Sequence, residues 1–190
     1  MPRLGRNPGA ATSDDDRFAQ LSRLLHDADL ELTDRVGGAL LLLYGQPLSR
    51  ITAITTDQIT RRDQQVFLRF GHHDVHIPEP LATLLTSLLR DRRRYLGVGT
   101  PATNNWLFPG LLPGRPLTAA RLGERLRALG IRAQPSRRAA LTSLAAQLPA
   151  AVLAELLHLH PTTAVRWVRA AGGDWNRYAA QLVQARDHQP

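Results

Sequence analysis

The stretch Leu148–Trp175, LPAAVLAELLHLHPTTAVRWVRAAGGDW, predicts two short helices joined by a tight turn. Apolar residues recur at helical spacing over Ala150–Leu157, and Pro161 suits the first position of a second helix because its φ is fixed and it has no N–H to satisfy. That helix would stop at Gly172. Such a pair with a basic second helix is typical of a helix-turn-helix unit, whose second helix enters the DNA major groove. The turn position that usually holds glycine is His158 here.

The charge of the chain points to the same class of partner. Its 190 residues carry a net charge of +8, and all 24 basic residues are arginine, with no lysine. The planar guanidinium fork suits phosphate and guanine, so the excess favours nucleic acid first and anionic surfaces in general second. A codon bias toward arginine would explain the missing lysine but not the net charge.

The second helix of the C-terminal pair offers the best candidates for DNA contact. Its first turns and polar side carry Thr162, Thr163, Arg166 and Arg169. Because half or more of such contacts go to the backbone, they predict affinity for DNA better than choice of sequence. The spacing of Trp167 favours a core position for its indole ring. His158 and His160 in the turn are consistent with either a DNA contact or a solvated turn.

Other classes of protein are disfavoured. The chain has no cysteine, which excludes disulfides and thiolate metal sites, and no apolar run approaches the roughly 20 residues needed to cross a bilayer. An acidic N-terminal stretch argues against a signal peptide, so a cytoplasmic location is expected. The side chains of His72, His73, Asp74 and His76 are of the types that bind zinc, but their spacing fits a solvated or phosphate-facing hairpin tip better. No metal and no cofactor are predicted.

The rest of the chain predicts a mainly helical domain with a small antiparallel β-sheet. We expect a flexible arm over residues 1–13, one domain over 14–178, and a tail over 179–190. Residues 65–78 alternate like a β-hairpin, and the sequence leaves undecided whether 58–60 form a third strand. A loop is predicted over 97–115, anchored by the apolar plug Trp106–Phe108. Helices are predicted over residues 14–28, 33–44, 48–54, 80–94, 119–129 and 137–148. Their expected features include Phe18 on the first apolar stripe and N-caps at Thr33 or Asp34, at Thr118 and at Ser136.

Several motifs in this order resemble a known family. They are Leu40–Gly45 with Leu48–Ile51, the hairpin Val66–Pro78, Trp106–Pro109 with Arg115–Thr118, and the C-terminal helix pair. Together they cover about residues 33–167, and their order resembles the catalytic domain of the tyrosine recombinases, the phage-integrase family. The resemblance implies a fold of that type ending in the helix pair, double-stranded DNA as the partner, and a setting in DNA recombination or integration.

The catalytic residues of that family match this chain only in part. Its members attack a phosphodiester with a tyrosine while two arginines and a histidine or lysine hold the phosphoryl oxygens. In the match, the first arginine falls on Pro47, with Arg50 one helical turn later, and the hairpin lysine falls on His72. The histidine of the H-x-x-R motif falls on Gln134, and its arginine is kept as Arg137.

The last motif lacks the nucleophile. The family's L-G-H matches the residues that end at His158, and the tyrosine nine residues later falls on Trp167, whose indole cannot form a phosphoester. Only Arg137 and His158 survive as remnants of the catalytic set. Tyr178, eleven residues beyond the matched position, is the remaining candidate nucleophile near the C-terminus.

The resemblance therefore implies a DNA-binding protein on a degenerate recombinase fold that does not cut DNA, acting as an accessory or regulatory factor. One alternative is a divergent active recombinase that uses Tyr178, and another is a helix-turn-helix transcriptional regulator. A third is a subunit that joins a homo-oligomer or an active recombinase through its C-terminal helix. The predicted DNA contacts are Arg50, His72, Arg137, Arg138, His160, Thr162, Thr163, Arg166 and Arg169.

Overall fold

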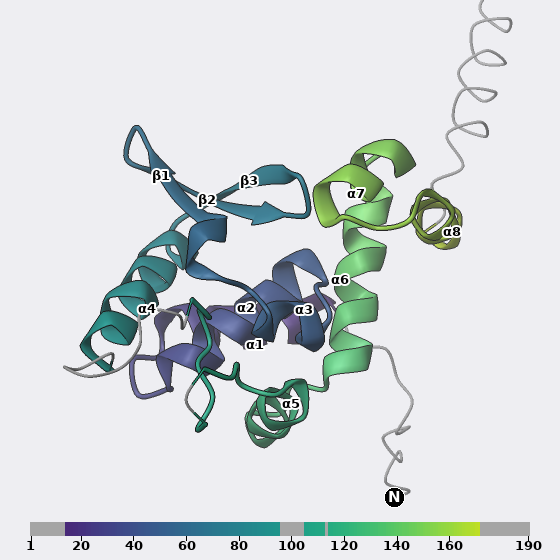
Figure 1. Ribbon diagram of the computed structural model, residues 1–190. Coiled ribbons are helices and arrows are strands. Elements are labelled where there is room, and N and C mark those ends of the chain that lie inside the picture. The colour runs from purple at the N-terminus through teal and green to yellow at the C-terminus, as the bar shows by residue number, and fades with distance from the viewer. Residues whose placement is uncertain (1–13, 96–104, 113, 172–190) are drawn as a thin grey trace, which may run out of the picture. The chain divides into compact units, whose positions relative to one another are not determined.

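The computed structural model describes residues 14–95, 105–112 and 114–171 (Figure 1). The chain divides into two compact units, Met1–Ala140 and Leu141–Pro190, with the boundary inside one helix, α6 (Ala133–Gln147). The first unit contains α1 (Asp14–His26), α2 (Leu32–Tyr44), α3 (Leu48–Thr52), a 3₁₀ turn η1 (Thr56–Gln58), β1 (Ile59–Arg62), β2 (Gln65–Phe70), β3 (His73–Ile77), α4 (Leu81–Tyr95) and α5 (Ala119–Ala128). The second contains α7 (Ala150–Leu157) and α8 (Pro161–Ala170).

The apolar helix α2 is the centre of the first unit. It contacts α1, α3, α4 and α5, and its residues from Val36 to Leu42 are buried. Two glycines allow this close packing. A Cβ built at Gly38 would lie 2.6 Å from Leu24 Cδ1, and one at Gly37 would lie 3.2 Å from the Leu122 methyl groups. The run of leucines therefore lies in the core, as its lack of a polar face predicts.

Three antiparallel strands form one sheet in the order β1-β2-β3. Alternate residues of β2, among them Leu68 and Phe70, are buried on one face, and Leu68 pairs with Ile59 on β1 and Val75 on β3. The third strand that the sequence leaves undecided over residues 58–60 is present as β1, but it begins at Ile59, because Gln58 belongs to η1. Of the four residues predicted at the hairpin tip, only His72 lies in the turn, because β3 already begins at His73, which pairs with Phe70.

The loop before α5 is anchored as predicted. Leu107 and Phe108 are fully buried, and the Leu107 N–H donates to the Ile54 carbonyl at 2.8 Å. The Trp106 indole is only half-buried, and its Nε1 donates to the Gly114 carbonyl at 3.0 Å. This plug ties the segment after α4 to the end of α3.

Some local predictions are wrong, while the cap at Thr118 is confirmed. Helix α2 begins one residue before Thr33, so neither Thr33 nor Asp34 is its cap. Helix α6 begins at Ala133, because the first turn of a helix tolerates a proline without an N–H, and Ser136 is a buried residue inside it. Phe18 is 59% exposed rather than part of the core.

The second unit contains the predicted helix, turn and helix. Helices α7 and α8 contact each other, and Leu153, Leu157 and Ala164 are buried. Val152 is 44% exposed, contrary to the expectation that it belongs to the apolar face. The predicted arm over 1–13, the helix stop at Gly172, Tyr178 and the tail over 179–190 lie outside the described residues. In the part of the chain that is described, no helix is long and apolar enough to span a bilayer.

Candidate nucleic-acid interface

The turn between α2 and α3 places two arginines of the first unit near each other. Gly45 ends α2 with a left-handed backbone (φ 58°), a conformation that glycine adopts readily, and its N–H donates to the Leu41 carbonyl. Pro47 then precedes α3 as its N-cap residue, and Arg50 lies one turn into that helix. The position matched to the family's first arginine is thus the residue that precedes a helix.

Arg137 reaches this turn from α6. Its Nε donates to the Gly45 carbonyl at 2.8 Å, while Arg50 Nη1 donates to Oε1 of the buried Gln46 at 3.2 Å. Burial lowers the pKa of Arg137, and the positive charge of Arg50 lowers it further. Two guanidiniums that repel each other favour an anion between or beside them. We call Gly45, Gln46, Arg50 and Arg137 the arginine corner.

The neighbouring Tyr44 is not a poised nucleophile. Its ring packs against Phe70 with centroids 5.5 Å apart, and burial raises the pKa of the Tyr44 hydroxyl to about 12. A nucleophilic hydroxyl needs a lowered pKa or an adjacent base. At neutral pH this phenol stays protonated, so Tyr44 contributes packing to the corner.

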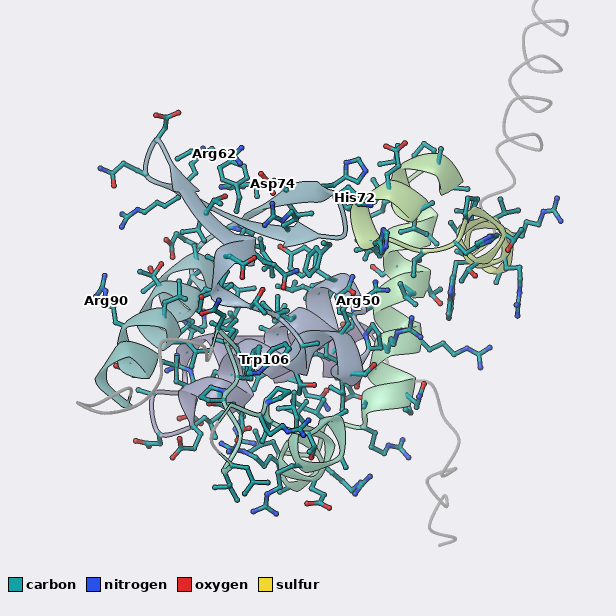
Figure 2. The ribbon with its side chains drawn as sticks, in the orientation of Figure 1. Arg50, Arg62, His72, Asp74, Arg90 and Trp106 are labelled. Carbon is teal, nitrogen blue, oxygen red and sulfur yellow. The ribbon has the colours of Figure 1, made fainter. Side chains whose placement is uncertain are left out.

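The sheet carries charged side chains on its exposed face, and many of them are paired. Arg62 forms an ion pair with Asp74 across the sheet, and its guanidinium lies 5.4 Å from the centroid of the Phe67 ring (Figure 2). The Phe67 ring also meets the ring of His76 edge-on at 5.6 Å. His72 is exposed at the hairpin turn. Within the described residues, no group of three or more acidic or histidine side chains is arranged to hold a metal ion.

Several arginines are structural, which the composition does not reveal. Arg17 is buried and its Nη1 donates to the Leu42 carbonyl at 3.1 Å. Arg35 donates to the carbonyls of Leu24 and Leu25 at the end of α1, where a cation also suits the helix dipole. A signal was present for Arg17, since it lies four and seven residues before Leu21 and Leu24, on the apolar stripe of α1.

Arg125 is a further internal arginine. Its Nε lies 2.7 Å from Oδ1 of Asp34, whose side chain is only 10% exposed. The pair joins α5 to α2. Oδ1 has no well-aligned hydrogen bond among the described residues, so this contact is an ion pair rather than a linear hydrogen bond. The net charge of +8 therefore overstates the charge that faces solvent.

Helix α8 of the second unit presents the other group of predicted contacts. Thr162, Arg166 and Arg169 are exposed, and Thr163 is half-buried. His160 has a local role, because its Nδ1 accepts from the Thr162 N–H at 3.4 Å and lies 2.8 Å from Thr162 Oγ1. It is the N-cap of α8, which explains why the turn ends there. A DNA contact by His160 stays a prediction.

The turn between α7 and α8 has a left-handed backbone at His158, with φ 50°. This conformation strongly favours glycine, and His158 ends α7 as its C-cap residue. Trp167 is half-buried on α8, beside the buried Val168. The core position expected for Trp167 is thus only partly realised.

The predicted site residues fall into two groups. Arg50 and Arg137 meet at the arginine corner, and His72 and Arg138 are exposed on the same unit. The other predicted contacts belong to α8 and to the residue that caps it: His160, Thr162, Thr163, Arg166 and Arg169. Tyr178 lies outside the described residues. The Gly45 carbonyl, which sequence reasoning did not single out, is what orients Arg137.

Comparison with known proteins supports the fold assignment. The solved structures that the chain resembles include XerA recombinase, with a TM-score of 0.60 and 17% identity over 100% of this chain and 67% of that one. They also include XerH site-specific recombinase bound to its palindromic difH substrate in a post-cleavage complex, with a TM-score of 0.58 and 15% identity over 92% of this chain and 55% of that one. The chain has a tyrosine-recombinase fold. No family model and no curated protein matches it. At these identities the recombinase fold is shared, but the site must be argued from this chain's own residues.

Proposed function

We propose that this protein binds duplex DNA on a recombinase fold without cutting it, as an accessory or regulatory factor in DNA recombination. The observation that supports this most is Trp167, the residue matched to the nucleophile, on the ordered helix α8. An indole has no hydroxyl or thiol with which to attack phosphorus, so the cleavage step lacks its reacting group at this position.

The set of arginines that holds the phosphoryl oxygens in the resembled family is also changed in this chain. The residue matched to the first arginine, Pro47, has no side-chain donor, and Arg137 already donates its Nε to the Gly45 carbonyl. Arg50 and the other nitrogens of Arg137 suit a phosphate oxygen at the corner. This arrangement favours holding a phosphate over stabilising a pentavalent transition state, which needs donors aimed at the developing charge.

The backbone conformation of His158 argues against matching it to the histidine of the L-G-H motif. Because His158 has the left-handed conformation that favours glycine, a shift of the match by one residue sets His158 against the glycine of L-G-H. The histidine of the motif then falls on Leu159, whose side chain cannot donate to a phosphate. The tyrosine position moves from Trp167 to Val168, which has no nucleophilic group either. On this assignment Arg137 is the sole remnant of the catalytic set.

Helix α8 would supply the groove contacts. Its exposed Thr162, Arg166 and Arg169 lie on a helix whose N-terminal turn is capped by His160, and helices of this size enter the major groove. We expect most of the affinity to come from phosphate contacts of the arginines, with base contacts adding a smaller discrimination.

A gel-shift titration of the full chain against duplex DNA at several salt concentrations tests the proposal. We expect salt-sensitive binding, with the slope reduced by about 1 in Arg166→Ala and in Arg169→Ala because each removes about one phosphate contact. Arg127→Ala on α5 is the matched control, since it removes the same charge from another exposed helix. Absence of binding at micromolar protein and low salt would refute the proposal.

The enzyme alternative has a direct test. A nicked suicide substrate traps a covalent protein–DNA adduct if any tyrosine attacks the phosphodiester. We expect no adduct. An adduct that disappears in Tyr178→Phe would replace our proposal with a divergent active recombinase.

The division into two compact units favours the second candidate, a helix-turn-helix regulator whose α7 and α8 read a specific operator. A regulator would prefer its site over random duplex by about 10³-fold or more, whereas a backbone-binding accessory factor would not. Selection of bound sequences from a random duplex pool followed by competition separates the two. Recovery of one strongly preferred site would favour the regulator.

A further inference from the structure

The segment before α5 exposes two adjacent leucines. Leu111 is 98% exposed and Leu112 is 69% exposed. The segment is held on both sides, because the Gly110 N–H donates to the Arg115 carbonyl at 2.8 Å and the Leu117 N–H donates to the Phe108 carbonyl at 2.8 Å. These hydrogen bonds on either side of the leucines reduce the conformational entropy that the segment would lose on binding. We call Leu111 and Leu112 the leucine tip.

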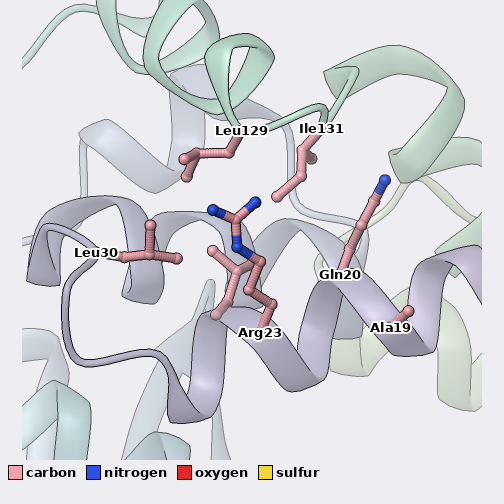
Figure 3. Close-up of a pocket in the computed structure, with 7 residues that line it drawn as sticks. Ala19, Gln20, Arg23, Leu30, Leu129 and Ile131 are labelled. Carbon is pink, nitrogen blue, oxygen red and sulfur yellow. The ribbon is translucent and has the colours of Figure 1, made fainter.

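The same unit carries an apolar hollow of about 200 Å³ near the other end of α5. Figure 3 shows its walls, formed by α1 below and by the connection from α5 to α6 above. The lining residues are Ala19, Gln20, Arg23, Leu24, Leu30, Leu129 and Ile131. An apolar space of about 150 Å³ holds a benzene ring, so the hollow is large enough for a leucine side chain.

The two features cannot meet within one chain. The leucine tip precedes the N-terminus of α5, and Leu129 and Ile131 of the hollow follow its C-terminus. A helix of 10 residues is about 15 Å long, and both of its ends are packed in the same unit. A leucine tip that fills the hollow therefore comes from a second molecule.

We propose that the hollow takes the leucine tip of a second copy of this chain. Since a tip and a hollow lie at opposite ends of one helix, two copies with antiparallel α5 helices exchange tips in a self-complementary contact. The exposed side of α5 fits this arrangement. Arg121 and Glu124 pair with each other at 3.2 Å within α5, and an antiparallel partner helix would offer each of them a second side chain of opposite charge. Arg23 rises from α1 with its guanidinium end toward Leu129 and Ile131, so its positive charge lies at the hollow (Figure 3).

Sedimentation of the full chain over a range of concentrations tests the association. We expect a dimer whose dissociation constant rises by at least about tenfold in Leu111→Arg and again in Leu112→Arg, because a positively charged tip cannot enter an apolar hollow that Arg23 lines. Val165→Arg is the matched control, since it replaces an exposed apolar residue of the second unit and should leave the dimer unchanged. A chain that stays monomeric, or a dimer unaffected by the tip substitutions, would overturn the proposal.

Directed crosslinking locates the contact even if a charged tip impairs folding. The chain has no cysteine, so introduced cysteines report cleanly. Chains with Leu111→Cys are mixed with chains with Ala19→Cys on the wall of the hollow, and the two are distinguished by mass. We expect a mixed disulfide that does not form with Ala128→Cys, an exposed alanine of α5 outside the hollow. Equal crosslinking to both sites would overturn the proposal, independently of DNA binding or cleavage.

Discussion

Arginines of the first unit and arginines of α8 have the same chemistry but opposite surroundings. In the first unit Arg17, Arg125 and Arg137 donate to carbonyl oxygens or pair with a carboxylate in buried or half-buried positions. On α8, Arg166 and Arg169 point to solvent. The guanidinium suits both settings because it is planar, offers five hydrogen-bond donors and stays charged at any physiological pH. Arginine content alone therefore cannot measure a nucleic-acid surface.

The largest effect is expected at the internal ion pair. Arg125→Ala leaves the carboxylate of Asp34 buried without its cation, so we expect the free energy of unfolding to fall by about 2–3 kcal/mol. Urea denaturation of the full chain measures this change. Arg127→Ala on the same helix is the control and should change stability by less than about 0.5 kcal/mol. Equal losses in both variants would contradict a structural role for Arg125.

The arginine corner should show a smaller effect of the same kind. Arg137→Ala removes the hydrogen bond to the Gly45 carbonyl, and we expect a loss of about 1–2 kcal/mol in the free energy of unfolding. The neighbouring Arg138 is exposed and provides a matched control with the same loss of charge. Equal stability of the two variants in thermal denaturation would contradict a structural role for Arg137.

The exposed arginines should behave in the opposite way. Arg166→Ala should alter the free energy of unfolding by less than about 0.5 kcal/mol, since the side chain is exposed on α8. The same substitution should weaken DNA binding. A variant that loses stability and keeps its affinity would reverse the contrast between the two groups.

The smallest effect at neutral pH is expected for Tyr44. Burial raises the pKa of its hydroxyl from 10.0 to about 12, so the unfolded chain loses this proton at lower pH than the folded chain. Its contribution to stability is complete below pH 10 and is lost as the pH rises from about 10 to about 12. Absorbance titration should show one late tyrosine that is absent in Tyr44→Phe. A normal titration of all tyrosines would show that the ring is more accessible than its packing indicates.

Regular elements were predictable because they depend on local periodicity. The leucine run of α2, the alternation of β2 and the proline that starts α8 each limit the backbone within a few residues. The order of motifs sufficed to recognise the fold. Helix starts were less predictable, since Thr33 and Ser136 can serve as caps by their chemistry, and packing decided against both.

The candidate site was predictable only as a set of residues. Sequence matching selected Arg50 and Arg137, but it did not show that Arg137 would bind the end of α2 through the Gly45 carbonyl. Nor did composition separate Arg17 and Arg125 from arginines that face solvent. Such roles depend on atoms far apart along the chain, which local patterns do not contain.

The sequence by itself determined the helical pair at the C-terminal end, the small sheet, the arginine excess and the tryptophan at the position matched to the nucleophile. These follow from residue type and spacing. Only the tertiary structure decided which arginines are buried, that His158 has a left-handed backbone, and that Leu111 is exposed while Leu107 is buried. The physical reason is that burial and partner choice are set by contacts between distant segments, whereas periodicity reports only the face that each segment can offer.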